Sequence, residues 1–149
     1  MNLDVVFYWM LAVVAGSLGG IHVPINGALG ARINSPLVAT FTFYGIGFAI
    51  ITALCLIRWD RAAFQALATV PKWYFIAGVI SVLSVGSSTF LIPRVGAVNL
   101  FVVVVASQMT VRMVISHYGW LESPVSAVSW IKILGALLLV LGAVLVVRD

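Results

Sequence analysis

The sequence predicts an all-α integral membrane protein, a bundle of five transmembrane helices. Of its 149 residues, 63% are hydrophobic and only 8% are charged, whereas soluble domains have about 45–50% apolar and about 25% charged residues. A soluble fold of this length cannot bury so much apolar surface, but a bilayer accommodates it. The apolar residues also fall into five long stretches, and runs such as 100–106 do not alternate as the strands of a membrane β-barrel do.

Each of the five stretches has roughly the 20 residues that a helix needs to cross a hydrocarbon core of about 30 Å. The breaks between them are residues 34–36 (Asn-Ser-Pro), 93–94 (Pro-Arg) and 119–124, because proline does not continue a helix and asparagine or serine caps the next one. With no internal repeat and no linker, residues 1–149 are predicted to form a single transmembrane domain. The predicted helices are 5–31, 36–57, 73–93, 95–116 and 128–147.

The charged residues are typical of membrane edges. The net charge is +4, but the eight Lys and Arg are dispersed along the chain. They form no basic stripe that could follow a nucleic acid, and single charges at the ends of spans are usual in membrane proteins. The connection 58–72, flanked by tryptophan and basic residues, is predicted to lie at the membrane interface as an amphipathic segment.

The ionisable residues do not form a catalytic or metal-binding group. His22 and His117 belong to different spans, Cys55 is the only cysteine, and the four acidic residues all fall outside the spans. A nucleophile with its base, or a set of metal ligands, requires several such groups close together. We therefore expect no enzyme, no cofactor and no metal site.

The first span combines a proline with polar residues. Pro24 is expected to kink or break the helix, and Asn26 and His22 lie one turn apart beside it. A discontinuous helix can line a substrate cavity, which makes both residues candidate substrate contacts; the alternative is a packing groove with a satisfied histidine. The span also carries a stripe of glycines suited to close helix approach: Gly16, Gly19, Gly20, Gly27 and Gly30.

Neutral polar side chains line one face of the second and third spans. Serine and threonine hydroxyls can bond to their own helix backbone, so such stripes usually indicate packing, with the lining of a cavity as the alternative. From these stripes we take Tyr44 and Ser84 as candidate substrate contacts. The stripes are Thr40, Tyr44 and Gly47, and Ser81, Ser84 and Ser88.

The fourth span carries Gln108, Arg112 and Ser116 at successive i+4 positions on one face. An arginine inside a span is unfavourable by about 2.5–3.5 kcal/mol at the centre, so it normally faces protein or water. Arg112 either extends to the lipid headgroups or attracts an anionic substrate; Gln108 is a further candidate contact. In the fifth span, Gly135 and Gly142 share a face and form a candidate dimer seam, which a helix of the same subunit could equally use.

Five motifs follow one another along the chain: residues 24–30 (PINGALG), 92–97 (IPRVGA), Gln108, 117–121 (HYGWL), and the segment from Lys132-Ile133-Leu134-Gly135 to Gly142. In this order and spacing they resemble the five-helix, YdcZ-type branch of the drug/metabolite transporter superfamily. The likeness covers nearly the whole chain. The small multidrug resistance proteins are four-helix relatives, whose glycine seam in the last helix resembles Gly135 and Gly142.

The resemblance implies a transporter built of inverted repeats, either as a tandem ten-helix chain or as a pair of five-helix chains. We expect a ten-helix inverted-repeat assembly in a bacterial-type inner membrane, as an antiparallel homodimer with dual topology or as a heterodimer with a paralogue. Basic residues on the N-terminal side outnumber those on the other side by five to three, so neither orientation is strongly enforced. The five are Arg58, Arg61, Lys72, Arg112 and Lys132.

The chain also departs from the family pattern. Ser107, Arg112 and Ser116 stand where a glycine, a small neutral residue and an acidic residue are usual in the branch it resembles. The small multidrug resistance proteins carry a glutamate in their first helix, whereas no acidic residue lies within residues 5–31 here. These differences weaken the inference of proton-coupled cation export.

We interpret the chain as a secondary transporter or facilitator that moves a small polar or anionic metabolite across the inner membrane by alternating access. Its cavity is expected around Asn26 and the face that carries Gln108 and Arg112. One alternative is export of lipophilic or guanidinium-like cations over aromatic faces such as those of Tyr44 and Trp73. Another is a non-transporting scaffold subunit with a dry core. The expected partners are a small-molecule substrate, lipid and a second subunit, and not nucleic acid.

Overall fold

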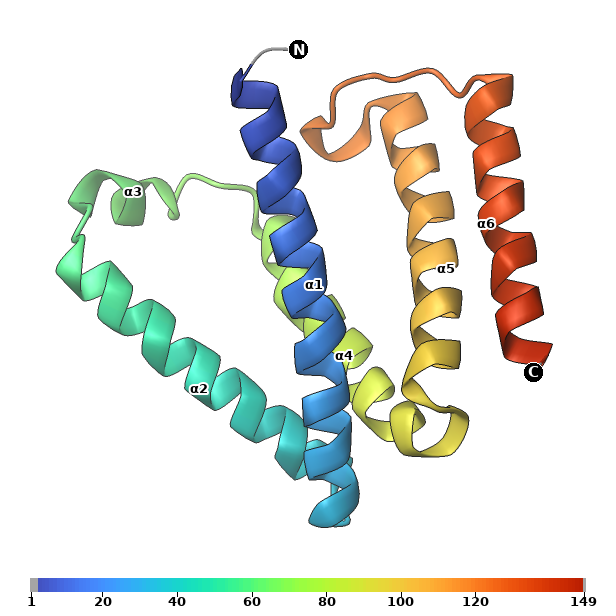
Figure 1. Cartoon of the computed structure of the whole chain (residues 1–149). Helices are drawn as coiled ribbons and strands as arrows, with labels where there is room; N and C mark the ends of the chain where they lie inside the picture. Colours follow the sequence, from blue (N-terminus) through green and yellow to red (C-terminus); the bar gives the residue numbers. More distant parts are fainter. Residues whose placement is uncertain (1–2, 149) are drawn as a thin grey trace. The chain divides into compact units, whose positions relative to one another are not determined.

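The computed structural model describes residues 3–148, and helices are the regular secondary structure of that range, with no strand in it. Five helices are long and apolar enough to cross a membrane, which confirms the predicted all-α fold with five spans. The short α3 falls in the connection 58–72 that we expected at the membrane interface (Figure 1). The 3₁₀ turn η1 starts at the last residue of that connection and covers the beginning of the third predicted helix, 73–93. The elements are α1 (Leu3–Arg32), α2 (Pro36–Ile57), α3 (Arg61–Ala66), η1 (Lys72–Phe75), α4 (Ile76–Val95), α5 (Ala97–Tyr118), η2 (Trp120–Glu122) and α6 (Trp130–Arg148).

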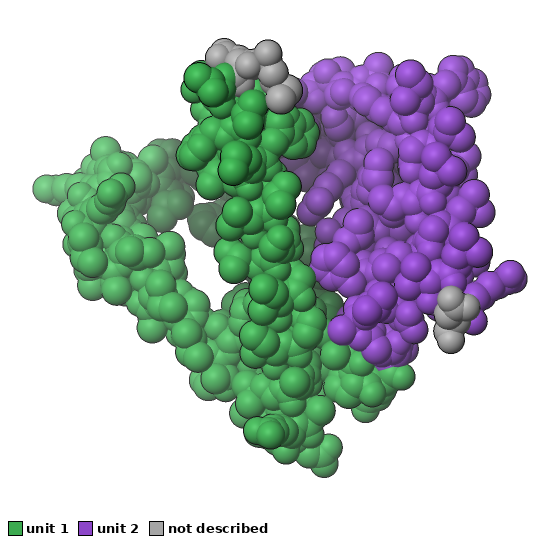
Figure 2. Space-filling view, in the orientation of Figure 1, with its two compact units in different colours: residues 1–94 green, residues 95–149 purple. Residues whose placement is uncertain are grey.

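The chain divides into two compact units, residues 1–94 and residues 95–149 (Figure 2). The first unit contains α1, α2 and α4, and the second contains α5 and α6 joined by a loop with η2. Each unit is described separately below. The single transmembrane domain over 1–149 stays a prediction.

The turn between α1 and α2 follows the sequence pattern closely. Asn34 adopts a left-handed conformation with φ of 54°, which asparagine tolerates better than most residues. Ser35 then caps α2, because its hydroxyl oxygen accepts a hydrogen bond from the Val38 amide at 3.3 Å. Pro36 occupies the first turn of α2, where its missing N–H would have no partner in the helix anyway.

Two prolines lie inside helices without ending them. α1 is helical without interruption from Leu3 to Arg32, so Pro24 does not break it, and the alternative kink at Pro24 stays a prediction. α4 likewise continues through Pro93 to Val95, and the chain turns at Gly96, whose φ of +84° favours glycine. A proline removes one amide donor, and membrane helices tolerate this loss because local adjustments satisfy the freed carbonyl. Glycine, rather than proline, ends this helix.

The motif His117-Tyr118-Gly119-Trp120-Leu121 forms the end of α5 and the start of its loop. Gly119 terminates α5 in the left-handed conformation, with φ of 65°. The following segment is fastened to that helix end: the Ser126 amide donates to the Ser116 carbonyl at 2.9 Å, and the Val128 amide donates to Nδ1 of His117 at 3.2 Å. These bonds keep residues 123–129 non-helical, so α6 begins at Trp130 rather than at residue 128 as predicted.

Most large apolar side chains of the spans are exposed, as expected of helices in lipid. Trp9 is 67% exposed and Ile131 82%, and an exposed apolar surface of this extent is not tolerated in water. The buried residues of the described chain are small, and half of the buried side chains other than glycine are polar. Those side chains are Ala39, Ala106 and Ala143, with Asn26, Thr40 and Thr89.

Candidate functional site

The first polar centre lies in the unit of residues 1–94, where α1, α2 and α4 meet. Asn26, Thr40 and Thr89, here called the Asn26 cluster, are 4%, 4% and 1% exposed. Nδ2 of Asn26 donates to Oγ1 of Thr89 at 2.6 Å, and Oγ1 of Thr40 lies 3.5 Å from the same oxygen. The cluster therefore joins one residue from each of three helices.

The hydroxyl protons of this cluster are already used within their own helices. Thr89 donates to the Val85 carbonyl at 2.8 Å, and Thr40 donates to the Pro36 carbonyl at 2.8 Å. Thr89 can therefore only accept from Asn26, which fixes the direction of that bond. No buried side-chain nitrogen or oxygen in residues 3–148 lacks a partner. The Asn26 cluster therefore packs three helices together, and none of its buried polar atoms is left without a hydrogen-bond partner to offer a ligand.

Two glycines bring the helices close enough for these bonds. A Cβ atom on Gly27 would lie 2.8 Å from Cβ of Ile92 in α4. On Gly30 it would lie 2.9 Å from Cγ2 of Thr89. Gly16, Gly19 and Gly20, by contrast, have no other atom within 4 Å of such a Cβ. Only the C-terminal part of the predicted glycine stripe is used for helix approach within this chain.

His22 and Tyr44 lie in an aromatic group next to this cluster, about one turn away along α1 and α2. The His22 ring stacks on Phe43 with centroids 5.3 Å apart, and Phe43 meets Tyr44 edge-on at 5.1 Å. Nδ1 of His22 lies 3.2 Å from the Leu18 carbonyl, and the Tyr44 hydroxyl lies 2.5 Å from Oγ of Ser81 in α4. Both predicted residues are half-buried and bonded within the unit.

Ser84 does not join these contacts. It is exposed, and its neighbour on the predicted stripe, Ser88, donates its hydroxyl to the Ser84 carbonyl at 2.9 Å. Thr89, which the sequence reasoning did not select, occupies the central position instead. From the sequence, Thr89 is one of several hydroxyl residues on this helix. Such hydroxyls most often bond to a carbonyl of their own helix, so nothing in the sequence distinguished Thr89 from its neighbours.

The second polar centre lies in the unit of residues 95–149 and is a pocket of about 470 Å³. We call it the basic pocket because two cations, Arg112 and Lys132, line it together with two serine side chains and three apolar ones. Its lining includes no carboxylate. Of the predicted face on the fourth span, Arg112 and Ser116 line the pocket, whereas Gln108 is exposed and is not part of it. The lining residues are Val105, Met109, Arg112, Met113, Ser116, Ser126 and Lys132.

The two cations of the basic pocket differ in their bonding. Nζ of Lys132 donates to Oγ of Ser126 at 2.6 Å and to the Ala127 carbonyl at 2.9 Å. Arg112 is exposed, and its guanidinium forms no hydrogen bond or ion pair with any residue in the range 3–148. Sequence reasoning missed Lys132 and Ser126 because the loop that carries Ser126 folds back onto the end of α5.

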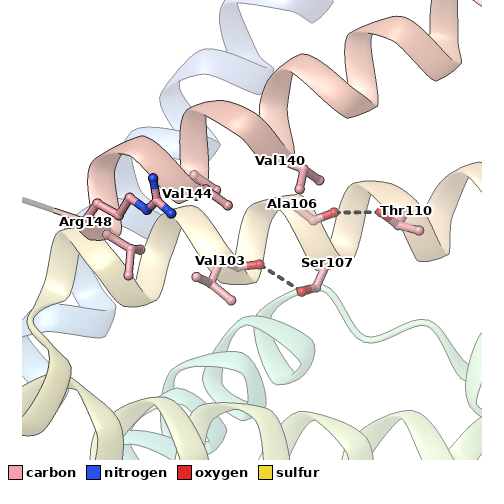
Figure 3. A pocket seen from close by; sticks show the side chains of 9 residues that line it. Val103, Ala106, Ser107, Thr110, Val140, Val144 and Arg148 are labelled. Carbon is pink, nitrogen blue, oxygen red and sulfur yellow. Dashed lines mark hydrogen bonds between the residues drawn. The ribbon is translucent and has the colours of Figure 1, made fainter.

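A second groove of about 390 Å³ lies between α5 and α6 and has a different character (Figure 3). Its two hydroxyls are turned onto their own helix: Ser107 donates to the Val103 carbonyl at 2.9 Å and Thr110 to the Ala106 carbonyl at 3.0 Å. The remaining lining is apolar except for Arg148. This groove suits a hydrocarbon chain or a packed helix better than a polar substrate.

The predicted dimer seam takes no part in the packing of α5 against α6. A Cβ atom on Gly135 or Gly142 would meet nothing within 4 Å, whereas Ala106 and Ala143 are buried. The role of the two glycines between subunits stays a prediction. In residues 3–148, no three His, Cys, Asp or Glu side chains gather as metal ligands.

Comparison with known proteins identifies a family. Residues 7–145 match the sequence model of the family described as "Putative inner membrane exporter, YdcZ". The match covers nearly the whole chain and includes every candidate site residue discussed above. No curated protein and no solved structure gives a significant match.

Proposed function

Because the chain belongs to the YdcZ family of inner membrane exporters, we propose that it moves a small anionic molecule across that membrane and captures it in the basic pocket. Membership of an exporter family points away from an enzyme and places this multi-pass protein in the inner membrane. The family description names no substrate. The choice of an anion rests on the chemistry of the pocket.

The observation that carries the proposal is the guanidinium of Arg112, which has no partner in residues 3–148 and lines the same pocket as Lys132. Arg112 lies within α5, in its last two turns, where a cation without a counter-charge is unfavourable. A second cation in the same pocket adds repulsion, which an anionic ligand would relieve. Among residues 3–148, no acidic side chain lines the pocket to supply the counter-charge, so a bound anion is the simplest source.

The position of the pocket along the chain also fits capture by an exporter. It lies at the end of α5 that connects to residues 119–129. With five crossings, this end is on the same side of the membrane as the N-terminus, the side that the small excess of basic residues favours as cytoplasmic. In an antiparallel homodimer or a paralogous heterodimer, each copy would provide one such entrance, as alternating access requires.

The assembly is tested by fusing reporters to the C-terminus of the full chain. Dual insertion predicts signal from both a cytoplasmic and a periplasmic reporter. Signal from one reporter alone would exclude the antiparallel homodimer and leave a paralogous partner or a parallel oligomer.

The substrate class is tested by a thermal-shift screen on the purified chain with matched anionic, neutral and cationic metabolites. A ligand that binds only the folded state raises its stability with occupancy, so anions should stabilise the wild type and Arg148→Gln but not Arg112→Gln. Arg148 is the matched control because it is a cation of the same unit that lines the other groove. Stabilisation by guanidinium-like cations instead, unaffected by Arg112→Gln, would favour the cation alternative.

A further inference from the structure

We propose that the ligand of the basic pocket is an amphiphilic phosphate, with its phosphate held by Arg112, Lys132 and Ser126 and its apolar body against Val105 and Met109. This inference rests on the proposed function for the pocket's role in transport. It names the chemical class of the ligand and two residues, Lys132 and Ser126, that the sequence analysis did not select as ligand contacts.

The lining of the pocket changes from apolar to charged along α5. Val105 and Met109 lie deeper in the helix, and Arg112 and Ser116 follow toward its C-terminal end. From Val105 to Arg112 the rise is roughly 10 Å, the length of a short alkyl chain. A ligand lying along this face would place an apolar part toward the membrane interior and a polar head toward the loop.

Three side chains present free donors at the polar end. Arg112 offers its five N–H groups, since none bonds to residues 3–148. Lys132 uses two of its three N–H donors on Ser126 and Ala127 and keeps one. Ser126 accepts from Lys132, so its own hydroxyl proton remains available. Ser116 contributes no donor, because its hydroxyl donates to the Pro124 carbonyl at 3.3 Å.

This donor set suits a phosphate better than a carboxylate. A bidentate arginine engages both oxygens of a planar carboxylate, so Lys132 and Ser126 would have to share those same two oxygens. A phosphate monoester has three terminal oxygens and a charge of about −1.5 to −2 at pH 7, which matches donors from three side chains and two positive charges. The pocket volume of about 470 Å³ leaves room for more than the head group.

The loop holds these groups in place before a ligand arrives. The Ser126 amide is bonded to the Ser116 carbonyl and the Val128 amide to His117, so the residues on either side of Ala127 are fixed to the end of α5. A site arranged in advance loses less conformational entropy on binding. This gives the His117 motif a positioning role for Ser126.

Two kinds of molecule carry the groups that this pocket fits: an anionic phospholipid of the bilayer and a soluble organophosphate. Both carry a phosphate and an apolar body, and basic pockets between membrane helices are known to hold lipid head groups. The experiment below separates them.

The test measures binding of hexyl phosphate to the purified full chain in a neutral detergent, with hexanoate, inorganic phosphate and hexyl glucoside as comparisons. We expect hexyl phosphate to bind at least about tenfold more tightly than each of the others. Arg112→Gln and Lys132→Gln should each weaken its binding by at least about tenfold, because each removes a hydrogen bond between charged groups. Arg112→Lys keeps the positive charge but loses the planar guanidinium that can bind two oxygens at once. Its affinity for hexyl phosphate should lie between those of the wild type and Arg112→Gln. Arg148→Gln should bind as the wild type does.

Equal binding of hexanoate and hexyl phosphate would overturn the proposal, as would unchanged binding in both Gln variants. Native mass spectrometry and competition with dihexanoyl phosphatidic acid, against dihexanoyl phosphatidylcholine, identify the source. A retained anionic lipid that is lost in Arg112→Gln points to the bilayer, and the absence of retained lipid and of competition points to a soluble organophosphate. Either outcome supports the phosphate site.

Efflux of hexyl phosphate from proteoliposomes keeps this inference separate from the proposed function. Binding that depends on Arg112 without any efflux would uphold the phosphate site and count against capture for export. Arg112-dependent movement of another anion, with no binding of hexyl phosphate, would overturn the phosphate site and leave the proposed function standing.

Discussion

The two polar centres of this chain differ in whether their polar side chains have hydrogen-bond partners within the chain. In the Asn26 cluster, the amide and both threonine hydroxyls bond to one another or to helix carbonyls, and all three side chains are at most 4% exposed. In the basic pocket, Arg112 is exposed and has no partner in residues 3–148. A satisfied buried group holds helices together, whereas an open cation is free to bind. Neutral polar side chains thus pack the helices of the first unit, whereas the second unit keeps a cation to which our proposal assigns ligand binding.

Glycine substitution is expected to give the largest effect and tests the packed side of this comparison. Gly27→Ala places a Cβ 2.8 Å from Cβ of Ile92, and such overpacking typically destabilises by about 1–3 kcal/mol. Gly19→Ala is the matched control in the same helix, because its Cβ meets nothing within 4 Å. Thermal unfolding in detergent should show a loss for Gly27→Ala alone. Equal stability of the two variants would mean that α1 and α4 are not in close contact at Gly27.

Arg112→Gln tests the other half of this comparison, the exposed arginine of the basic pocket. We expect efflux of the anionic substrate to fall by at least about tenfold, equivalent to about 1.4 kcal/mol, while thermal stability changes by less than about 0.5 kcal/mol, as for a surface side chain without partners. Arg148→Gln is the control in the transport assay. Unchanged efflux in Arg112→Gln would show that Arg112 only extends toward the lipid headgroups.

The membrane fold could be predicted from sequence because lipid leaves few choices. Five apolar stretches must be helices, and Ser35-Pro36 marks a helix start by local chemistry alone. The helix end at Gly96 was misplaced at Pro93, because a proline breaks helices in water more reliably than in a membrane. Capping and proline rules thus predict where a helix begins or ends from a few neighbouring residues. The proline rule is less reliable in lipid than in water.

The sites were predictable only in part, because they depend on contacts between helices. Arg112 could be found as a charge inside a span, and Asn26 as a polar residue beside Pro24. Thr89 lies 63 residues from Asn26, and no spacing rule connects them. Lys132 reaches the basic pocket through a loop that folds back onto α5, a path that periodicity does not encode.

The two amides selected from the sequence offer a smaller and direct comparison. Asn26→Ala removes the buried bond to Thr89 between α1 and α4 and should destabilise by about 0.6 to 1.7 kcal/mol, the average and the upper value for bonds between membrane helices. Gln108→Ala removes an exposed amide outside the pocket and should leave stability unchanged. Chemical unfolding in mixed micelles measures both. A loss of stability in Gln108→Ala that matches or exceeds the loss in Asn26→Ala would contradict the division into a packed and an open centre.

The smallest expected effect concerns the hydroxyl that links α2 to α4. Tyr44→Phe keeps the ring against Phe43 and removes only the bond between the Tyr44 hydroxyl and Ser81. Bonds between membrane helices average about 0.6 kcal/mol, because the unfolded chain in a membrane also finds partners. Ser84→Ala, on the same helix as Ser81 but without a hydroxyl bond to another helix in residues 3–148, is the control and should have no effect. A double-mutant cycle of Tyr44→Phe with Ser81→Ala should give a coupling energy close to the single loss. A coupling energy of zero, with transport impaired in Tyr44→Phe, would instead assign Tyr44 to the substrate path.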